Sequence, residues 1–313
     1  MSKVAFVFPG QGSQTVGMCK AFYDEYAVAR RVFEEADEAL GFSITKMCFE
    51  GPESDLRLTY NTQPAILTAS TACAAVLKEK GIACDVAAGH SLGEYSALVN
   101  TGALAFADAV RIVRKRGQFM QDAVPVGEGS MAAVLGLESD KIVEICQAVE
   151  DEGGEAVQAV NFNCPGQVVI AGAVNAVNKA VEALKAAGAK RAVLLPVSAP
   201  FHSSLMQPAS ERLAEVLAPI EIKDITIPVV ANVTAKEVTS GAEIKELLVK
   251  QAAMPVLWET SVRNMVADGV DTFVEVGPGK VLTGFTKKIA KGLPALNIED
   301  PASLEKVLAH FEK

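Results

Sequence analysis

Short apolar runs that carry almost no charge recur along this chain, and they restrict its fold more than any other feature. The first, Val4–Phe8, ends at Pro9-Gly10. A run of this kind is typical of a strand buried on both faces, because a strand with one solvated face alternates apolar and polar residues. Similar runs follow at 85–89, 192–197, 228–231 and 272–276.

Helical patterns separate these runs, for example over 64–80, 106–121, 208–217 and 256–268. Strands that alternate with helices predict an α/β fold with a mostly parallel sheet. The last residues, 303–313, have the pattern of a terminal amphipathic helix.

The segment 126–197 departs from this alternation. Its pattern predicts a strand at 130–137, a helix at 139–150, two strands at 156–161 and 167–171, a helix at 174–187 and a strand at 191–195. This βαββαβ order is that of a ferredoxin-like unit. We therefore predict a large α/β part made of residues 1–125 and 198–313, interrupted by a small ferredoxin-like part at 126–197.

The composition excludes several classes of protein. Half of the residues are hydrophobic (50%), which is enough for a core and excludes intrinsic disorder. Lys and Arg number 29 against 38 Asp and Glu, and the net charge of −9 argues against a nucleic-acid partner, because neutralising phosphates needs a basic face. Anionic small substrates stay open, since they need only a local cluster of Lys or Arg.

The cysteines and the apolar stretches indicate the cellular compartment of the protein. None of the six cysteines forms a C-x-x-C pair, so we predict small buried thiols and no metal site. The run 4–8 is too short for a signal peptide, and the longest uncharged stretch, 58–77, holds too many polar residues for a membrane span. The sequence therefore predicts a soluble, cytoplasmic protein with no membrane partner.

Gly89-His90-Ser91-Leu92-Gly93 matches the G-x-S-x-G pattern of a nucleophile elbow. An apolar run leads into it and a helical pattern follows at 94–99, as that motif requires. The two glycines let strand and helix approach closely while Ser91 is held out near a helix N-terminus, whose N–H groups favour a developing negative charge. A chance match in a glycine-rich turn is the alternative.

A serine nucleophile needs a general base, because its hydroxyl reacts poorly at neutral pH. The chain has three histidines. His90 is adjacent to Ser91 and should point away from it, so we interpret it as a wall of the pocket, and His310 falls in the terminal helix. His202 follows an apolar run, in a loop, and is the predicted base.

The oxyanion of an acyl-transfer reaction needs N–H donors. The backbone N–H of Leu92, one residue after the nucleophile, is the first candidate. The second is the N–H of Gln11, in the loop 9–14 after the first strand. A phosphate-binding loop is the competing interpretation of 9–14, but this segment lacks both Gly-Lys-Ser/Thr and G-x-G-x-x-G.

Together these motifs resemble those of the malonyl-CoA:acyl carrier protein transacylases and the related acyltransferase domains of polyketide synthases. The resemblance runs through nearly the whole chain, in blocks at 8–14, 89–95, 116–120, 161–167, 200–202 and 275–279. It implies a hydrolase-like α/β core with an inserted ferredoxin-like part. It also implies a ping-pong reaction with no bound cofactor, serving fatty-acid or polyketide synthesis. Ser91 would take the malonyl group from malonyl-CoA, and the phosphopantetheine thiol of acyl carrier protein would then take it from Ser91.

The resemblance assigns roles to two further side chains. Arg116 would bind the malonyl carboxylate, because a guanidinium matches a carboxylate with two hydrogen bonds and an unpaired buried charge is costly. Without the resemblance, the run 111–116 reads as a solvated basic face, and its other cations keep that interpretation. Phe201 would exclude the extra methyl group of a methylmalonyl unit, and it fits a core position equally well.

No acidic residue stands out as the partner of His202. The resemblance implies that the backbone carbonyl of Gln251 takes this place, where it would fix the imidazole tautomer. Asn161 and Gln167 match family positions near the pocket, and buried turn capping explains them equally well.

Rival functions stay open on the sequence alone. A serine hydrolase or thioesterase would need an acidic residue and then a histidine near the C-terminus, and it leaves Arg116 and Phe201 unexplained. A non-catalytic binding module would have no use for an intact Ser91 and His202, and a different acyl donor is a third alternative. For the docking of a carrier protein, the candidates are the surface cations at 190–191 and 287–288.

Overall fold

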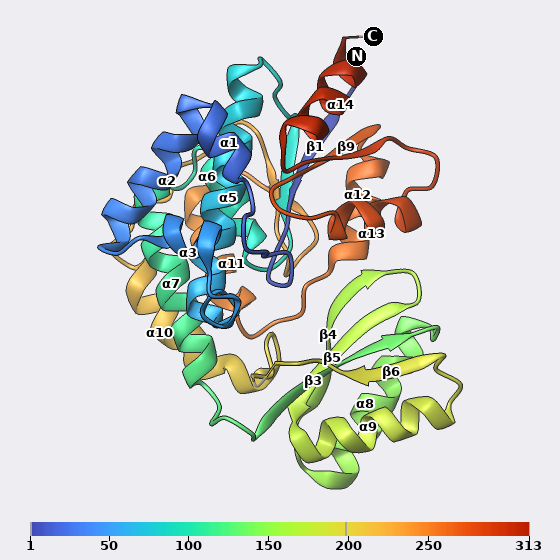
Figure 1. The fold of residues 1–313 in the computed structure, drawn as a ribbon. Coiled ribbons are helices and arrows are strands. Elements are labelled where there is room, and N and C mark those ends of the chain that lie inside the picture. Colours follow the sequence, from blue (N-terminus) through green and yellow to red (C-terminus); the bar gives the residue numbers. More distant parts are fainter. Residues whose placement is uncertain (1, 198, 313) are drawn as a thin grey trace.

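The computed structural model describes residues 2–197 and 199–312, which form two parts with separate sheets (Figure 1). The larger sheet has the strand order β10-β9-β1-β2-β7-β8 and is parallel except for β8, which is antiparallel to β7. Its strands are β1 (Val4–Phe8), β2 (Val86–Gly89), β7 (Val229–Val230), β8 (Glu237–Val238), β9 (Thr272–Val276) and β10 (Ala295–Ile298). The predicted α/β fold with a mostly parallel sheet is confirmed.

The helices of this part precede and follow the strands along the chain. They are α1 (Lys20–Glu25), α2 (Ala27–Leu40), α3 (Ile44–Glu50), α4 (Glu53–Leu56), α5 (Thr59–Glu79), α6 (Gly93–Thr101), α7 (Phe106–Asp122), α10 (Gln207–Leu217), α11 (Gly241–Gln251), α12 (Trp258–Ala267), α13 (Val281–Ile289) and α14 (Pro301–Phe311). A short 3-10 helix, η1 (Ser204–Met206), leads into α10.

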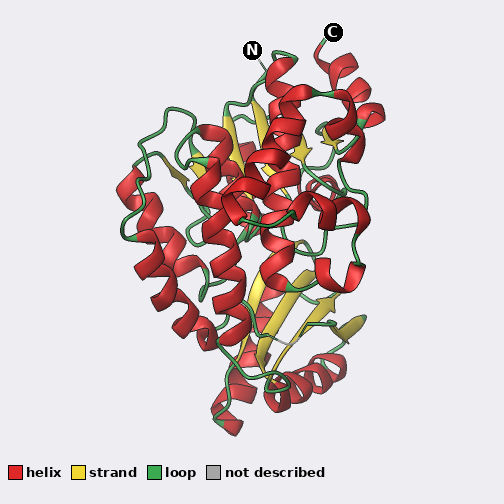
Figure 2. Cartoon of the chain, turned by 60° about the vertical axis from the view of Figure 1, so that its left-hand side comes forward, coloured by secondary structure: helices red, strands yellow, loops and turns green. Residues whose placement is uncertain are grey.

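Helices cover both faces of the parallel sheet, which explains why its strands are apolar throughout (Figure 2). All five residues of β1 are buried. Val4, Phe6 and Phe8 belong to one core with α2, α5 and α7, whereas Ala5 and Val7 belong to a second core with α12 and α13. The alternation of side chains along a strand thus feeds two cores from one apolar run.

The smaller sheet has the strand order β4-β5-β3-β6 and is antiparallel. Its strands are β3 (Gly129–Leu135), β4 (Val157–Cys164), β5 (Gln167–Ala173) and β6 (Arg191–Leu194). The helices α8 (Ser139–Gly153) and α9 (Val174–Ala186) pack on it and share its core. The predicted βαββαβ order is therefore observed, while the domain boundaries at 126 and 197 stay a prediction.

The run 192–197 is not a buried strand of the parallel sheet, so that interpretation was wrong. Its first residues form β6, an edge strand of the small sheet. Ala192 packs into the small core, but Val193 and Leu194 are 47% and 49% exposed. An edge strand has a hydrogen-bonded neighbour on one side only, so an apolar run need not be enclosed there.

Helix α5 begins at Thr59, five residues before the predicted start at 64, and it contains Pro64. Proline has no N–H, so the carbonyl of Tyr60 loses its partner within the helix. Arg114 Nη1 donates to this carbonyl at 3.3 Å, and its guanidinium lies over the Phe42 ring, 4.4 Å from the centroid. The half-buried Arg114 is therefore a structural residue rather than part of a solvated basic face.

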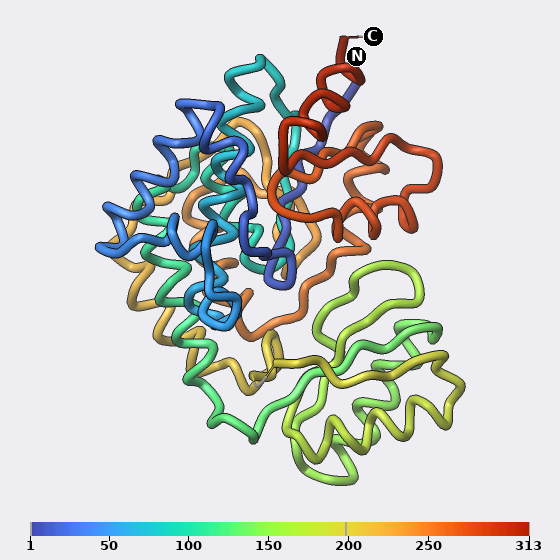
Figure 3. Tube along the Cα trace, viewed as in Figure 1, coloured from blue at the N-terminus to red at the C-terminus, as the bar shows by residue number. Residues whose placement is uncertain are grey.

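The two parts are joined where the chain crosses between them after α7 and again before η1 (Figure 3). A Cβ on Gly129 would lie 2.3 Å from the Pro200 ring, so the outgoing and returning segments touch at a point that only glycine allows. A third connection joins β4 to the segment before α12, where Phe162 N–H donates to the Val256 carbonyl at 3.0 Å. These contacts place the loops of both parts around one cavity.

All six cysteines are free and buried, as predicted. In the described part of the chain, no helix is both long and apolar enough to cross a membrane.

Candidate active site

A cavity with about 600 Å³ of empty space, including its mouth, lies between the two parts. The large part contributes Gln11, Gln63, His90, Ser91, Leu92, Arg116, Met120, Phe201 and His202 to its lining, and the small part and its return segment contribute Met131, Asn161, Leu195 and Val197. The site is thus formed only because the small part is inserted beside the loops of the parallel sheet.

Ser91 lies on a tight turn between β2 and α6. A Cβ on Gly89 would lie 1.9 Å from the carbonyl carbon of Gly93, and a Cβ on Gly93 would lie 2.1 Å from the Phe8 carbonyl oxygen. The two glycines are therefore required by close packing, as the motif predicted. Ser91 itself has a φ of 51°, a conformation that a residue with a side chain adopts only when its surroundings hold it there.

Ser91 and His202 form a hydrogen-bonded pair, with Oγ 2.7 Å from Nε2. The backbone of His202 also lies in the left-handed region, with a φ of 62°. On the far side of the ring, Nδ1 is 2.8 Å from the backbone carbonyl of Gln251. A carbonyl only accepts, so Nδ1 carries the proton and Nε2 keeps the lone pair that faces the serine.

The environment of His202 keeps its imidazole neutral. Burial, and then the positive charge of Arg116, lower the pKa of His202 from 6.5 to about 3. The side chain is only 3% exposed, so the charged form would be poorly solvated. A neutral imidazole with its lone pair on Ser91 Oγ is the arrangement that a general base needs.

The N–H groups of Leu92 and Gln11 are the two predicted oxyanion donors. Neither has a hydrogen-bond partner within residues 2–197 and 199–312, whereas the N–H of Ser91 donates to Asn232 Oδ1 at 2.7 Å. Both residues line the cavity beside Ser91. Free N–H groups at the start of a helix and in a loop next to the nucleophile can donate hydrogen bonds to a developing oxyanion.

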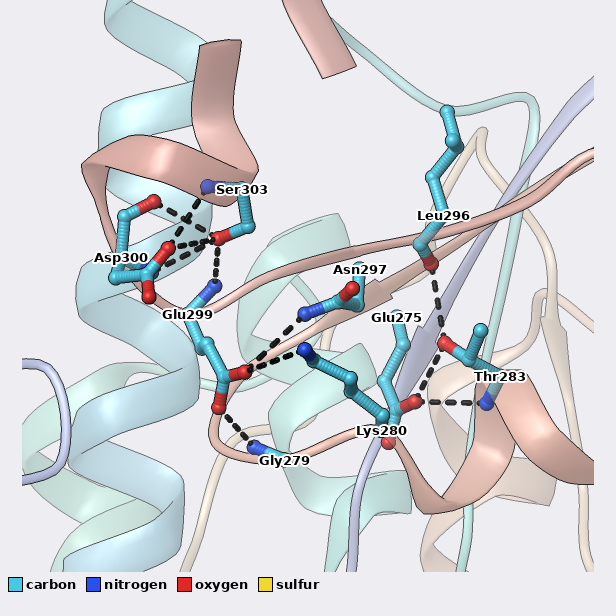
Figure 4. Close-up of polar contacts among 9 residues, drawn as sticks. All are labelled: Glu275, Gly279, Lys280, Thr283, Leu296, Asn297, Glu299, Asp300 and Ser303. Atoms are coloured by element: carbon cyan, nitrogen blue, oxygen red, sulfur yellow. Dashed lines mark hydrogen bonds and ion pairs between the residues drawn. The ribbon is translucent and has the colours of Figure 1, made fainter. Parts of the chain in front are cut away.

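The block 275–279 packs against the loop that carries Gln11. The buried carboxylate of Glu275 accepts hydrogen bonds from the N–H and the hydroxyl of Thr283, both at 2.7 Å, which fixes β9 to the start of α13 (Figure 4). Glu299 Oε2 accepts from the Gly279 N–H at 2.7 Å. A Cβ on Gly277 would lie 2.9 Å from the Pro9 ring. This block therefore supports the loop and contributes no side chain to the cavity lining.

Arg116 points into the cavity from α7 and is 1% exposed. Nη1 donates to Gln63 Oε1 at 2.7 Å, and Nη2 donates to Gln251 Oε1 at 2.8 Å and to Ser91 Oγ at 3.1 Å. Among the described residues its Nε–H has no partner. Burial lowers the pKa of Arg116. A buried guanidinium with an unpaired donor next to the nucleophile is suited to an anionic ligand.

The neighbouring cations of α7 have other surroundings. Arg111 is exposed and lies 3.6 Å from Asp108, and Lys115 is exposed as well. The solvated-face interpretation kept for the other cations of the run therefore holds for Arg111 and Lys115 and is wrong for Arg114, which is half-buried.

The remaining predicted residues differ in their relation to the cavity. Phe201 lines it and packs with Met120. His90 also lines it and is held by Asn163, whose Oδ1 is 2.8 Å from Nε2. Asn161 faces the cavity, and its buried Oδ1 has no partner among the described residues.

Gln167 does not line the cavity formed by the described residues. It begins β5 opposite Leu135, at the β4–β5 hairpin, and its Oε1 is 3.7 Å from Cys164 Sγ. This position favours the structural interpretation, hairpin formation, over a place in the pocket. His310 likewise contributes nothing to the lining and packs on Phe311 in α14.

Three residues that contact the predicted site residues were not predicted from the sequence. Gln63 holds Arg116, Asn232 holds the amide of Ser91, and Glu94 accepts a hydrogen bond from the side chain of Gln251 at 2.9 Å. Asn232 directly follows the short run 228–231, and a polar residue at the carboxyl end of a parallel strand is a recognisable signal. Gln63 carries no such signal, because nothing in the sequence relates it to Arg116.

Comparison with known proteins shows what this site is similar to. The model of the acyl transferase domain family matches residues 5–307. The malonyl CoA-acyl carrier protein transacylase of Bacillus subtilis is 52% identical over 305 residues, which cover 97% of this chain and 96% of that protein. The transacylase of the same name from Escherichia coli K12 is 50% identical over 309 residues, covering 98% and 99%.

Solved structures agree. A crystal structure of an acyl carrier protein S-malonyltransferase from Vibrio cholerae has a TM-score of 0.95 and 48% identity, covering 98% of this chain and 100% of that one. A complex of a type II polyketide synthase acyl carrier protein with its malonyl-transacylase has a TM-score of 0.96 and 46% identity, with coverage of 99% and 100%.

Proposed function

This chain belongs to the acyl transferase domain family and is an acyltransferase, and we propose that it transfers the malonyl group of malonyl-CoA to the phosphopantetheine thiol of an acyl carrier protein. The proposed partners are malonyl-CoA and the carrier protein, and the pathway is fatty-acid synthesis or polyketide synthesis. The proposed reaction uses no bound cofactor.

In the first half-reaction, Ser91 Oγ attacks the thioester carbonyl while His202 Nε2 takes the hydroxyl proton. The tetrahedral oxyanion is received by the N–H groups of Leu92 and Gln11, each worth about 3 kcal/mol in the transition state. Collapse breaks the carbon–sulfur bond, and the leaving thiolate of coenzyme A takes the proton from His202. The malonyl group is then an ester of Ser91.

The second half-reaction reverses these roles. His202 takes the proton of the phosphopantetheine thiol, whose sulfur attacks the ester carbonyl of malonyl-Ser91. The same N–H groups receive the oxyanion. Ser91 Oγ leaves and recovers its proton from His202, so the site returns to its starting state.

The observation that carries the malonyl assignment is the position of Arg116. Its guanidinium is 3.1 Å from the nucleophile, nearly fully buried, and has an unpaired N–H donor. We assign the free carboxylate of the malonyl group to this side chain, since such a carboxylate needs a charged partner inside a cavity. Phe201 is proposed to restrict the space beside the α-carbon.

Two further assignments belong to this proposal. The buried free thiols favour a cytoplasmic location, because disulfides form in oxidising compartments. The exposed cations Lys190, Arg191, Lys287 and Lys288 are proposed to meet the carrier protein.

The proposal is tested with purified holo-carrier and a panel of acyl-CoA thioesters. Transfer should be fastest for malonyl-CoA, and Ser91→Ala should abolish it. Release of free malonate at the same rate with and without carrier would instead favour a hydrolase.

A further inference from the structure

Three residues after the nucleophile, a buried carboxyl group has no part in the reaction described above. Glu94 is the second residue of α6 and is 2% exposed. One of its oxygens, Oε2, accepts two hydrogen bonds, from Gln251 Nε2 at 2.9 Å and from the backbone N–H of Asn232 at 3.1 Å. Neither donor is on α6, so one carboxylate oxygen ties together two segments that are remote in sequence.

The segment that contains Asn232 holds the nucleophile in place. The side chain of Asn232 accepts from the Ser91 N–H at 2.7 Å and donates to the Gly89 carbonyl at 2.6 Å. It therefore clamps the turn on both sides of His90 and helps to keep Ser91 at its φ of 51°. A residue in this conformation needs surroundings that over-determine it.

The segment that contains Gln251 holds the base, His202, and the guanidinium of Arg116. The backbone carbonyl of Gln251 accepts from His202, and its side-chain oxygen accepts from Arg116 Nη2. Because Arg116 only donates and Glu94 lies on the other side, the amide of Gln251 has one orientation, with its oxygen toward Arg116 and its nitrogen toward Glu94. Gln251 Nε2 also donates to the Ser91 carbonyl at 2.9 Å.

We propose that Glu94 is a positioning residue of this site, which through Asn232 and Gln251 sets the places of Ser91, His202 and Arg116 together. The inference rests on the proposed function only for the role of Arg116 toward a substrate carboxylate. The effect of Glu94 on the positions of Ser91 and His202 can be tested without any acyl-CoA.

The nature of the bond defines the variants. Glu94→Gln keeps an oxygen that can accept from both donors, whereas Glu94→Met has nearly the same length and accepts from neither. In the Met variant, the buried Asn232 N–H loses its acceptor and Gln251 Nε2 loses one of its acceptors and keeps the Ser91 carbonyl. Displacements of about 1 Å at a reacting centre cost on the order of 100-fold in rate.

The experiment measures how fast Ser91 reacts with a sulfonyl fluoride, which forms an Oγ–S bond and releases fluoride as His202 takes the proton. Folded Glu94→Met should react at least about 100-fold more slowly than the unmodified chain, and Glu94→Gln should stay within about tenfold of it. A matched control is Asp37→Asn, which changes a half-buried carboxylate that accepts from the N–H and the hydroxyl of Thr45, at 2.9 Å and 3.0 Å, and that does not line the cavity. Folded protein carrying this control change should react at the unmodified rate.

Two results would overturn the proposal: a folded Met variant that reacts normally, or a Gln variant as slow as the Met variant. If the Met variant does not fold, Glu94→Asp replaces it. Asp keeps the charge but retracts the oxygen by one carbon, so at least a tenfold loss is expected and an unchanged rate contradicts the inference.

A second measurement separates this inference from the proposed function. The ratio of malonyl to acetyl transfer should fall about tenfold in Glu94→Met, because Arg116 loses its orientation, and Glu94→Gln should restore it. If Glu94→Met reacts slowly with the sulfonyl fluoride and Glu94→Gln reacts nearly normally, while the unmodified chain transfers no malonyl group, the proposed function is refuted and the role of Glu94 is supported.

Discussion

Arg116 Nη2 lies 3.1 Å from Ser91 Oγ, and the same nitrogen donates to the side chain of Gln251. The guanidinium and the nucleophile therefore belong to one hydrogen-bonded unit rather than to separate subsites. A substrate whose carbonyl reaches Ser91 must place its next few atoms against Arg116, and an acyl group that ends in a carboxylate satisfies both contacts.

Replacing Arg116 by Ala should lower kcat/KM for malonyl-CoA about 100-fold and should relatively favour acetyl-CoA, since hydrogen bonds to a charged group are worth up to about 3 kcal/mol. Arg116→Lys should not restore malonyl transfer, because an ammonium cannot form the two parallel bonds. Arg111→Ala, at an exposed position on the same helix, is the matched control and should change neither rate. Unchanged malonyl transfer in Arg116→Ala would remove this residue from substrate binding.

Phe201→Ser should widen the cavity next to the acyl group. The ratio of methylmalonyl to malonyl transfer should rise about tenfold, the usual range for one methyl group in an apolar pocket. Competition between the two thioesters, read by mass spectrometry of the loaded carrier, measures it. A ratio that does not move would make Phe201 a packing residue, held with Met120.

The acylation rate should show no inflection from His202 above pH 5, because burial and Arg116 lower its pKa to about 3. Glu94 complicates the profile, since burial raises its pKa to about 7. The clean measurement is therefore the Glu94→Gln variant, whose acylation rate should be level between pH 5 and pH 8. A fall below pH 6.5 in that variant would show that the imidazole titrates normally.

Glu275 should make the chain more stable on mild acidification. Burial raises its pKa to about 7, whereas the unfolded carboxyl titrates near 4.5. Between these values the folded chain takes up a proton that the unfolded chain does not, so the contribution to the free energy of unfolding rises as pH falls from 7 to 4.5. Glu275→Gln should remove a gain on the order of 2 kcal/mol between pH 7 and pH 5.

His202 acts in the opposite direction. Its lowered pKa means that the unfolded chain binds the proton first, so its contribution is complete above pH 6.5 and is lost as pH falls toward 3. Denaturant unfolding of the unmodified chain and of Glu275→Gln at each pH separates the contribution of Glu275 from that of His202. A difference between Glu275→Gln and the unmodified chain that stays constant with pH would contradict the raised pKa of Glu275.

The strands that could be predicted are those whose apolar runs are enclosed by helices. Val4–Phe8 and Thr272–Val276 have the predicted bounds because every residue in them is buried. The strand β10 escaped notice because three of its four residues are only half-buried. The run at 192–197 misled for the opposite reason, since it is apolar but lies at an exposed sheet edge.

The residues of the site also differ in whether they could be predicted from the sequence. Ser91 is predictable because its glycines follow from local packing, and His202 because few histidines compete with it. Glu94, by contrast, acts through Gln251, which is 157 residues away, and no local pattern reports such a contact. Partners of this kind become visible only when the fold has brought the segments together.

The central claim, that Ser91 carries the malonyl group between two thiols, is tested most directly by trapping the intermediate. The chain is mixed with malonyl-CoA without carrier protein, digested and analysed by mass spectrometry. We predict a malonyl ester on the peptide that contains Ser91, which persists until holo-carrier is added and then disappears as malonyl-carrier forms. Malonylation that survives in Ser91→Ala, or malonate released without carrier, would contradict the account.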